Sequence, residues 1–374
     1  MKIKTITCHE VYNHGASLQE YALLKYLESL GHDSKTIQYK PDYLSNHFNL
    51  WIVSNTFFEK TIVLKIIYLI LKFPKRFISL KRKERFDEFS NKYINSTSRL
   101  YKTNEDLKNN LPEADAFICG SDQIWNSFFP NGKDPAFYLD FVPNNKLKIS
   151  YAASFAINKL EDEIKPFVKE KVSNLDFISV RELTGIDILK DLGITNAVQV
   201  LDPVFLLDKA HWNKLSETWI DGDYIFVYDF ESNPSIKKFV KELKIKYNCK
   251  IVTVNSNINY ADKNYHLKGP RTFLSLIENA KFVVSNSFHA VAFSIIYQKQ
   301  FVVFNRSENL NSRMQDLIDL LGIPEVLINS NDNTGQKKLF NINYSNLQPK
   351  LEILINFSKK YLIDSLEQNN NLLK

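Results

Sequence analysis

Polar groups that can carry out chemistry follow five separate apolar runs of the sequence. They are Asn13, His14 and Gly15; Gly120, Ser121, Asp122, Gln123 and Asn126; Arg181; Ser285, Asn286, Ser287 and His289; and Asn305, Arg306 and Arg313. Cations and free N–H groups bind anions, whereas amides, hydroxyls and carboxylates bind the hydroxyls of sugars. Brought together, this set suits a small, highly charged anion and a polyol.

Each of these features also has a purely structural interpretation. Gly15 can simply begin a helix, and Asp122 can cap the turn after its strand. Arg181 can belong to a weak surface ion pair, and His289 can be a core histidine of the apolar helix that it begins. Trp125 is of a type more often found in the core than on a ligand platform. The positions of these residues in the chain favour the functional interpretation, because all five groups follow predicted strands.

The motifs of several other chemistries are missing from the sequence. It has no G-x-S-x-G elbow, no H-E-x-x-H, no P-loop and no G-x-G-x-x-G fingerprint. His9 and His14 are the nearest pair of possible metal ligands, and an irregular loop separates them. We therefore expect no metal and no cofactor.

An alternation of strands and helices must position these loops. Residues 3–7 and 33–41 predict strands on either side of a helix at residues 17–31, with an S-x-x-E capping box at Ser17 and Glu20. This opening favours a parallel sheet. Open α/β sheets bind ligands outside the carboxyl ends of their strands, where the polar loops are predicted to lie.

A second α/β unit begins near Asp223, where apolar strand-like runs again alternate with helical patterns. The predicted fold class is therefore α/β, with two doubly wound, Rossmann-like domains that face a cleft. The predicted divisions are residues 1–205 for the N-terminal domain, 206–345 for the C-terminal domain, and 346–374 for a terminal helix that can pack back on the first domain and has a disordered end.

Residues from about 45 to 110 break the α/β rhythm and predict a helical, basic insertion. Its apolar run "FFEKTIVLKIIYLILKF" is too short and too charged for a membrane span. Seven cations follow, at Lys72, Lys75, Arg76, Lys81, Arg82, Lys83 and Arg85. The pattern fits an interfacial segment on an anionic membrane, but also a helix packed on the body with a solvated basic face.

Composition narrows the class of protein. The 374 residues are 44% hydrophobic and 24% charged, and the formal net charge of +6 is too mild for a nucleic-acid-binding signature. Three widely separated cysteines argue for a reducing compartment. The first residues alternate like a strand and lack the pattern of a signal peptide. We expect a cytoplasmic protein, with possible contact at the inner face of the membrane.

Several segments resemble the polysaccharide pyruvyl transferase family. The collinear matches are "NHGASLQEYALLKYLESLGH", "GSDQIWN", "SVRELTG", "LDPVFLL" and "GPRTFLSLIENAKFVVSNSFHAVAFSII". They extend over about residues 3 to 322. The resemblance implies a two-lobed fold similar to the B-type (GT-B) glycosyltransferases.

The resemblance also implies an activity. Such enzymes transfer the enolpyruvyl carbons of phosphoenolpyruvate onto two hydroxyls of a sugar, which gives a cyclic pyruvate ketal and phosphate. The expected partners are phosphoenolpyruvate and a glycan acceptor of capsule, exopolysaccharide or cell-wall synthesis, often lipid-linked.

Residue roles follow from the matched segments and the chemistry. The expected catalytic residues are His289, Asp122 and Arg181. The expected donor contacts are Arg181, Ser287, His289, Arg313, Gly15 and Ser285. The expected acceptor contacts are Asn13, Gly120, Ser121, Asp122, Trp125 and Asn126.

The chain departs from the family pattern at three positions. Ser287 stands where some members have an arginine, Ala290 replaces the usual glycine after the histidine, and His14 replaces a usual tyrosine. Arg313 or Arg306 can replace the missing donor contact. Two other hypotheses stay open: a nucleotide-sugar glycosyltransferase of the same architecture, and an inactive scaffold of capsule assembly.

Overall fold

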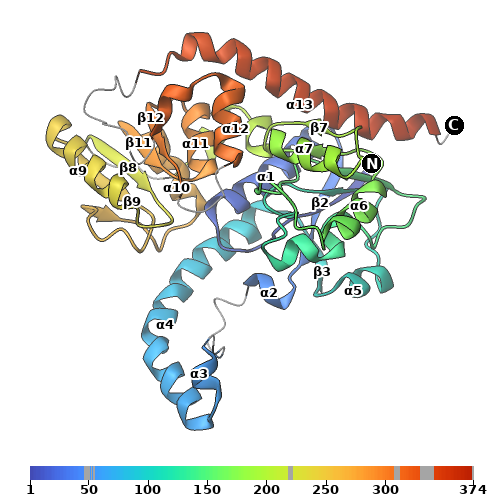
Figure 1. Ribbon diagram of the computed structural model, residues 1–374, viewed down its shortest axis with the longest axis horizontal. Helices are drawn as coiled ribbons and strands as arrows, with labels where there is room; N and C mark the ends of the chain where they lie inside the picture. Colours follow the sequence, from blue (N-terminus) through green and yellow to red (C-terminus); the bar gives the residue numbers. More distant parts are fainter. Residues whose placement is uncertain are drawn as a thin grey trace.

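The computed structural model describes residues 1–45, 51, 53, 55–217, 222–306, 312–328 and 341–372. The chain forms two α/β lobes that lie side by side, and a long C-terminal helix runs along both (Figure 1). A pair of helices from the first lobe projects away from the body.

The first lobe is built on a parallel five-stranded sheet with the strand order β3-β2-β1-β4-β5. Its strands are β1 (Lys2–Ile6), β2 (Asp33–Tyr39), β3 (Ser96–Tyr101), β4 (Ala116–Cys119) and β5 (Leu147–Ser150). A short parallel pair, β6 (Ser179–Val180) and β7 (Val198–Gln199), continues beyond β5 through isolated bridges. All four residues of β4 are buried, as expected for a central strand with helices on both faces.

The second lobe is built on a parallel six-stranded sheet with the order β10-β9-β8-β11-β12-β13. Its strands are β8 (Tyr224–Tyr228), β9 (Lys250–Thr253), β10 (Lys263–Asn264), β11 (Phe282–Ser285), β12 (Phe301–Phe304) and β13 (Leu327–Ile328). Because the strands of each sheet run parallel, their carboxyl ends meet at one edge. The loops at these two edges form the site described below.

Helices connect the strands of both lobes. In the first lobe they are α1 (His14–Ser29), α2 (Asp42–Ser45), α3 (Thr56–Glu59), α4 (Ile62–Tyr93), α5 (Asn104–Asn109), α6 (Lys165–Ser173) and α7 (Leu183–Asp191). Then follow α8 (Lys209–Leu215), α9 (Pro234–Tyr247), α10 (Pro270–Glu278), α11 (Phe288–Ile296), α12 (Ser312–Leu321) and α13 (Tyr344–Leu372). The stretch Pro203–Leu206 between the lobes is a 3₁₀ turn.

Helix α1 begins one turn earlier than its sequence pattern predicts. The side chain of Asn13 accepts hydrogen bonds from the backbone N–H groups of Gly15 and Ala16, so Asn13 is the N-cap. Ser17 lies inside the helix, and the Glu20 carboxylate contacts the Nδ1 atom of His9 at 2.7 Å. The predicted capping box is therefore wrong.

The predicted helical insertion is shorter than residues 45–110. Residues 96–101 form β3, the edge strand that pairs with β2, and only α3 and the long α4 project from the body (Figure 1). Residues 46–50, 52 and 54 of this range lie outside the described residues. Among the described helices, none is both long enough and apolar enough to cross a membrane.

One apolar core joins the two lobes. Leu18 of α1 and Phe89 of α4 belong to the same buried cluster as Phe273 and Phe293 of the second lobe. Helix α13 adds to this cluster through Leu351, and residues further along α13 pack beside Ile3 and Leu147 under the first sheet. The helix continues to Leu372, where a disordered end was predicted, and residues 373–374 lie outside the described part of the chain.

Candidate active site between the lobes

A small cavity of about 170 Å³ lies where the carboxyl ends of the two sheets face each other. It is lined by Asn13, Asp122, Gln123, Phe230, Asn286, Ser287, Phe288, His289, Arg306, Arg313 and Met314. The first three come from the first lobe and the rest from the second lobe. Five of the predicted site residues therefore meet in one cavity: Asn13, Asp122, Ser287, His289 and Arg313.

Asp122 reaches the cavity from a turn that follows β4. Its backbone adopts a positive φ of 67°, a conformation that aspartate tolerates better than most residues. The carbonyl oxygen of Asp122 accepts hydrogen bonds from Ile124 and Ser154, at 2.8 and 3.1 Å. The backbone is therefore fixed on both sides, while the carboxylate faces the cavity.

His289 lies in the first turn of α11, pressed against the start of α1. A Cβ atom added to Gly15 would lie only 2.1 Å from the Nδ1 atom of His289. Since real Cβ contacts are never so short, a larger residue at position 15 would displace the imidazole. Gly15 thus makes room for His289, and it is absent from the cavity wall where a donor contact was predicted.

A buried carboxylate, Asp202, lies beside Arg181 and His289 at the back of the site. Its Oδ2 atom lies 2.6 Å from Nη1 of Arg181, 3.6 Å from Nε2 of His289 and 3.2 Å from the hydroxyl of Ser121. Burial alone would raise the pKa of Asp202, but His289 and Arg181 outweigh it and hold the pKa below its usual range. Asp202 is therefore ionised and provides the counter-charge of Arg181.

Arg181 lies behind the cavity and not on its wall. Its side chain is 2% exposed, and its guanidinium carbon lies 4.4 Å from the ring centre of Phe288, which does line the cavity. Burial lowers the pKa of Arg181, but Asp202 and Glu182 raise it overall. We conclude that Arg181 supports the site through Asp202 and Phe288, where a direct donor contact was predicted.

Several buried nitrogen atoms around the cavity lack a hydrogen-bond partner in the described part of the chain. They are Nε and Nη2 of Arg181, Nε2 of His289 and Nε of Arg313. Burial and the charge of Arg181 lower the pKa of Arg313 to about 10. Buried donors without hydrogen-bond partners are costly, so His289 and Arg313, the two of these residues that line the cavity, favour an acceptor-rich anion there.

Two further contacts shape the wall near Arg313. With its amide oxygen turned toward Arg313, Gln123 accepts from Nη2 and Nη1 at 3.1 and 3.2 Å. On the opposite side, Arg306 pairs with Glu231 at 3.0 Å and stacks over the ring of Phe230. The two arginines are thereby held in place from different elements.

The loop after β4 contributes less of the wall than predicted. Trp125 is fully buried, stacks on Tyr138 and donates its indole N–H to the carbonyl of Phe137 at 3.0 Å. Asn126 is also buried, and its amide oxygen accepts a hydrogen bond from the backbone N–H of Phe128 at 3.0 Å. Both side chains are fully buried and neither lines the cavity, so their prediction as acceptor contacts is wrong.

Three other predicted contacts are likewise internal. Gly120 packs so closely that an added Cβ would lie 2.1 Å from the carbonyl oxygen of Tyr151. The hydroxyl of Ser121 donates to the carbonyl of Ala152 at 2.7 Å, and that of Ser285 donates to the carbonyl of Tyr228 at 2.6 Å. These residues shape the loops, and none of them lines the cavity.

Sequence reasoning missed Asp202 altogether as a site residue. Asp202 lies in the "LDPVFLL" segment, which contributes to the family resemblance, but no role was predicted for it. No role was predicted for Gln123 and Asn286, and Arg306 was predicted only as an alternative to Arg313 for the missing donor contact. All three line the cavity.

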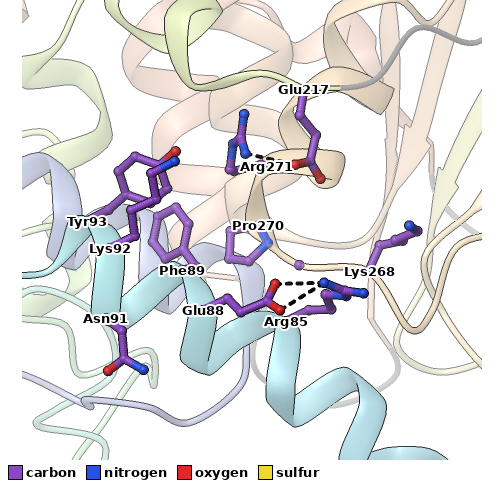
Figure 2. A pocket seen from close by; sticks show the side chains of 11 residues that line it. Arg85, Glu88, Phe89, Asn91, Lys92, Tyr93, Glu217, Lys268, Pro270 and Arg271 are labelled. Atoms are coloured by element: carbon purple, nitrogen blue, oxygen red, sulfur yellow. Dashed lines mark hydrogen bonds and ion pairs between the residues drawn. The ribbon is translucent and has the colours of Figure 1, made fainter.

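A second cavity, of about 750 Å³, lies between α4 and the start of α10 (Figure 2). Its two arginines are each paired with a glutamate: Arg271 with Glu217 at 3.0 Å and Arg85 with Glu88 at 2.8 Å. None of the described residues that line it has a buried polar atom without a partner. The smaller cavity is therefore the stronger candidate for an anion.

Comparison with known proteins gives a family and a fold. A family model described as polysaccharide pyruvyl transferase matches residues 13–308. No curated protein matches the chain.

Solved structures resemble the chain over almost its whole length. A putative UDP-N-acetylglucosamine 2-epimerase from Listeria monocytogenes is 10% identical, with a TM-score of 0.52 over 99% of this chain and 97% of that one. S. aureus MnaA, solved with UDP, is 13% identical, with a TM-score of 0.50 and the same two coverages. The Streptomyces sp. SF2575 glycosyltransferase SsfS6 is 10% identical, with a TM-score of 0.43 over 97% of this chain and 99% of that one.

At these identities the likeness concerns the fold alone. The prediction of two α/β lobes with parallel sheets, in a GT-B-like arrangement, is confirmed.

Proposed function

Because the chain belongs to the polysaccharide pyruvyl transferase family, we propose that it moves the pyruvyl group of phosphoenolpyruvate onto two hydroxyls of a sugar. The acceptor would be a precursor of a capsule, an exopolysaccharide or the cell wall. The observation that carries the proposal is the small cavity between the lobes, which is lined by Arg313 and His289, each with a buried nitrogen atom that has no hydrogen-bond partner among the described residues.

Phosphoenolpyruvate fits the charge and size of this cavity. It carries a phosphate and a carboxylate on three carbons, and two arginines and a histidine line the wall. The N-cap of α11, Ser287, makes no side-chain capping hydrogen bond, which leaves the first N–H groups of that helix available to an anion. A nucleotide sugar is much larger, and a volume of about 170 Å³ is below the roughly 300–1,000 Å³ of pockets for drug-sized ligands.

The proposed reaction needs one acid and one base. A proton added to C3 of phosphoenolpyruvate makes C2 electrophilic, and the first sugar hydroxyl then adds to C2 and loses its proton. The bond between C2 and the phosphate oxygen breaks, and the second hydroxyl adds to C2 and loses its proton. C3 keeps one proton as part of a methyl group, the other leaves with the phosphate, and the product is a cyclic ketal.

His289 is our candidate for the acid, and Asp122 for the base. Asp202 lies 3.6 Å from Nε2 of His289 and orients the imidazole from behind. Asp122 faces the same cavity from the other lobe, next to Asn13. The acid and the base thus come from opposite walls, and the sugar would enter from the side of the first lobe.

The direct test is the reaction itself. The purified protein should release phosphate from phosphoenolpyruvate only in the presence of a glycan acceptor. Mass spectrometry of lipid-linked glycans incubated with both should show a gain of one pyruvate less one water. Sugar transfer from a nucleotide sugar, with no reaction of phosphoenolpyruvate, would contradict the proposal and favour the glycosyltransferase hypothesis.

The change Arg313→Gln should weaken binding of phosphoenolpyruvate by about 10- to 100-fold, because a charge-assisted hydrogen bond contributes about 1.5–3 kcal/mol. Titration calorimetry with phosphoenolpyruvate measures the effect. The matched control is Arg271→Gln, which removes an arginine from the larger cavity. If both changes weakened the binding of phosphoenolpyruvate equally, the donor would bind outside the small cavity.

The change Gly15→Ala should lower kcat by about 10²-fold, because the new methyl group displaces the imidazole of His289. Steady-state kinetics of phosphate release measures the loss. Gly185→Ala is the control, since an added Cβ there lies 3.2 Å from its nearest atom, in Val180. A Gly15→Ala enzyme with full kcat would show that the position of His289 does not matter for the reaction.

A further inference from the structure

Helix α3 and the first half of α4 form an arm that projects from the first lobe (Figure 1). We define the arm as residues 55–81. Its surface is rich in large apolar side chains that are at least two-fifths exposed, namely Phe57, Ile62, Val63, Ile66, Ile67, Ile70, Leu71, Phe73, Phe77 and Ile78. Isolated exposed apolar residues are normal, but a contiguous patch of this size marks an interaction surface.

The exposed apolar residues of α4 share one side of the helix. Successive residues turn by about 100°, so positions 62, 63, 66, 67, 70, 73, 77 and 78 fall within about half of its circumference. Lys65, Lys72 and Arg76 fall on the opposite half. Lys72 and Arg76 both stack over the ring of Tyr68, 5.7 and 5.5 Å from its centre. The arm is therefore amphipathic, with an apolar side and a cationic side.

The charge of the arm is almost entirely positive, with Glu59 as its one acidic residue. Residues 60–83 contain eight lysines and arginines and no aspartate or glutamate. The cations nearest the body already have partners, since Arg82 donates to the carbonyls of Tyr12 and His266, and Lys83 pairs with Asp87. These contacts fix the root of the arm, and Lys65 and Lys72 lie further out along it.

We propose that the arm docks on an anionic lipid bilayer, with the apolar side in the interface and the cations at the headgroup phosphates. An amphipathic helix with a wide apolar side, flanked by lysine and arginine and without acidic residues, is the pattern of interfacial helices. A bilayer offers both an apolar layer and a negative surface. A second copy of the arm offers the apolar layer but carries the same positive charge.

An apolar groove on the arm also favours a lipid bilayer as its partner. About 510 Å³ of space lies between Trp51 and the apolar residues Ile66, Leu69, Ile70, Phe73 and Pro74 of α4. Trp51 is 77% exposed at its edge. An indole beside an apolar face is typical of the membrane interface, where one end of the ring is wet and the other is in hydrocarbon.

Membrane docking would bring the cavity between the lobes to a surface that holds lipid-linked glycans. That consequence rests on the proposed function, whereas docking itself does not. A protein that binds vesicles but transfers no pyruvyl group would leave the docking proposal intact. A protein that transfers the group but ignores vesicles would overturn it.

The test is flotation of the full-length protein with two kinds of vesicle. One is phosphatidylcholine alone, and in the other part of it is replaced by phosphatidylglycerol. The protein should float with the anionic vesicles, less at high salt because screening weakens the cationic contacts. The fluorescence of Trp51 should shift to the blue on binding, and Trp51→Phe should remove this shift while leaving flotation in place.

Two sets of variants separate the apolar and cationic contributions. The combined change Lys65→Gln, Lys72→Gln and Arg76→Gln should lower partitioning by about 100-fold, at roughly fivefold for each cation. The combined change Ile66→Ser, Ile70→Ser and Phe73→Ser should remove flotation even at low salt. All six side chains lie on the arm, outside the core clusters, so these variants should fold.

Matched controls come from other exposed positions. Lys238→Gln with Lys241→Gln on α9, and Ile353→Ser with Phe357→Ser on α13, should float like the original protein. Equal losses in the arm and control variants would overturn the proposal. A failure of the original protein to float would also overturn it. The same holds if sedimentation shows a dimer that the apolar substitutions dissociate, while binding to vesicles does not change.

Discussion

Replacing His289 by asparagine is expected to lower kcat for pyruvyl transfer by about 10²- to 10⁴-fold, the usual contribution of a general acid. Asparagine keeps a hydrogen-bond donor of similar size but cannot deliver a proton. Affinity for phosphoenolpyruvate should change far less, because Arg313 and the start of α11 remain in place. Single-turnover kinetics and titration calorimetry on the same variant separate the two effects.

The expected split between chemistry and binding distinguishes an acid from a simple phosphate contact. If His289 only bound the donor, calorimetry would show the larger loss and kcat at saturating donor would recover. His32→Asn is the control, because His32 lies beside Met1 at the amino end of the first sheet, away from the cavity. An enzyme with His289→Asn and full activity would refute the assignment.

The architecture could be predicted from the sequence because its signals are local and periodic. The buried runs "AFIC", "YIFVY" and "FVVS" form central strands, and parallel strands necessarily bring their carboxyl ends to one edge. This geometry explains why Asn13, Asp122 and His289, far apart in the chain, line one cavity. Strand β3 has the sequence "STSRLY", which is too polar to stand out as a strand. Its residues were therefore included in the predicted insertion.

Side-chain direction within irregular loops could not be predicted in the same way. Trp125 and Asn126 follow a turn with no period, so nothing in the sequence says that they point into the core while Asp122 points out. Asp202 poses the opposite problem. It meets His289 only because the 3₁₀ turn Pro203–Leu206 packs against α1 and α11, which is a tertiary contact without a local signal.

The buried pair of Arg181 and Asp202 is expected to dominate the stability of the site. Asp202→Asn should lower the free energy of unfolding by about 3–5 kcal/mol, because it leaves the guanidinium of Arg181 buried without its counter-charge. Arg181→Met should have a similar effect, because it leaves the carboxylate of Asp202 buried without its counter-charge. Chemical denaturation of each variant and of the double variant measures the coupling, and the double variant should lose much less than the sum.

Solution pH provides an independent check on this pair. The pKa of Asp202 is held below its usual range, so its contribution to stability is fully present above about pH 4, near the ordinary pKa of aspartate. It is lost as the pH falls through the pKa of the folded state. The difference in unfolding free energy between the original protein and Asp202→Asn should therefore be constant near neutral pH and shrink in acid.

An exposed ion pair serves as the control for these unfolding measurements. Lys281 and Asp223 form an ion pair in which both side chains are more than a third exposed, and Asp223→Asn should leave unfolding almost unchanged. If Asp202→Asn were as mild as this control, then water would reach Arg181, and its unpartnered nitrogen atoms would not be buried donors. The role of Asp202 as the buried counter-ion of the site would then be wrong, whereas the cavity nitrogen atoms of Arg313 and His289 would be unaffected.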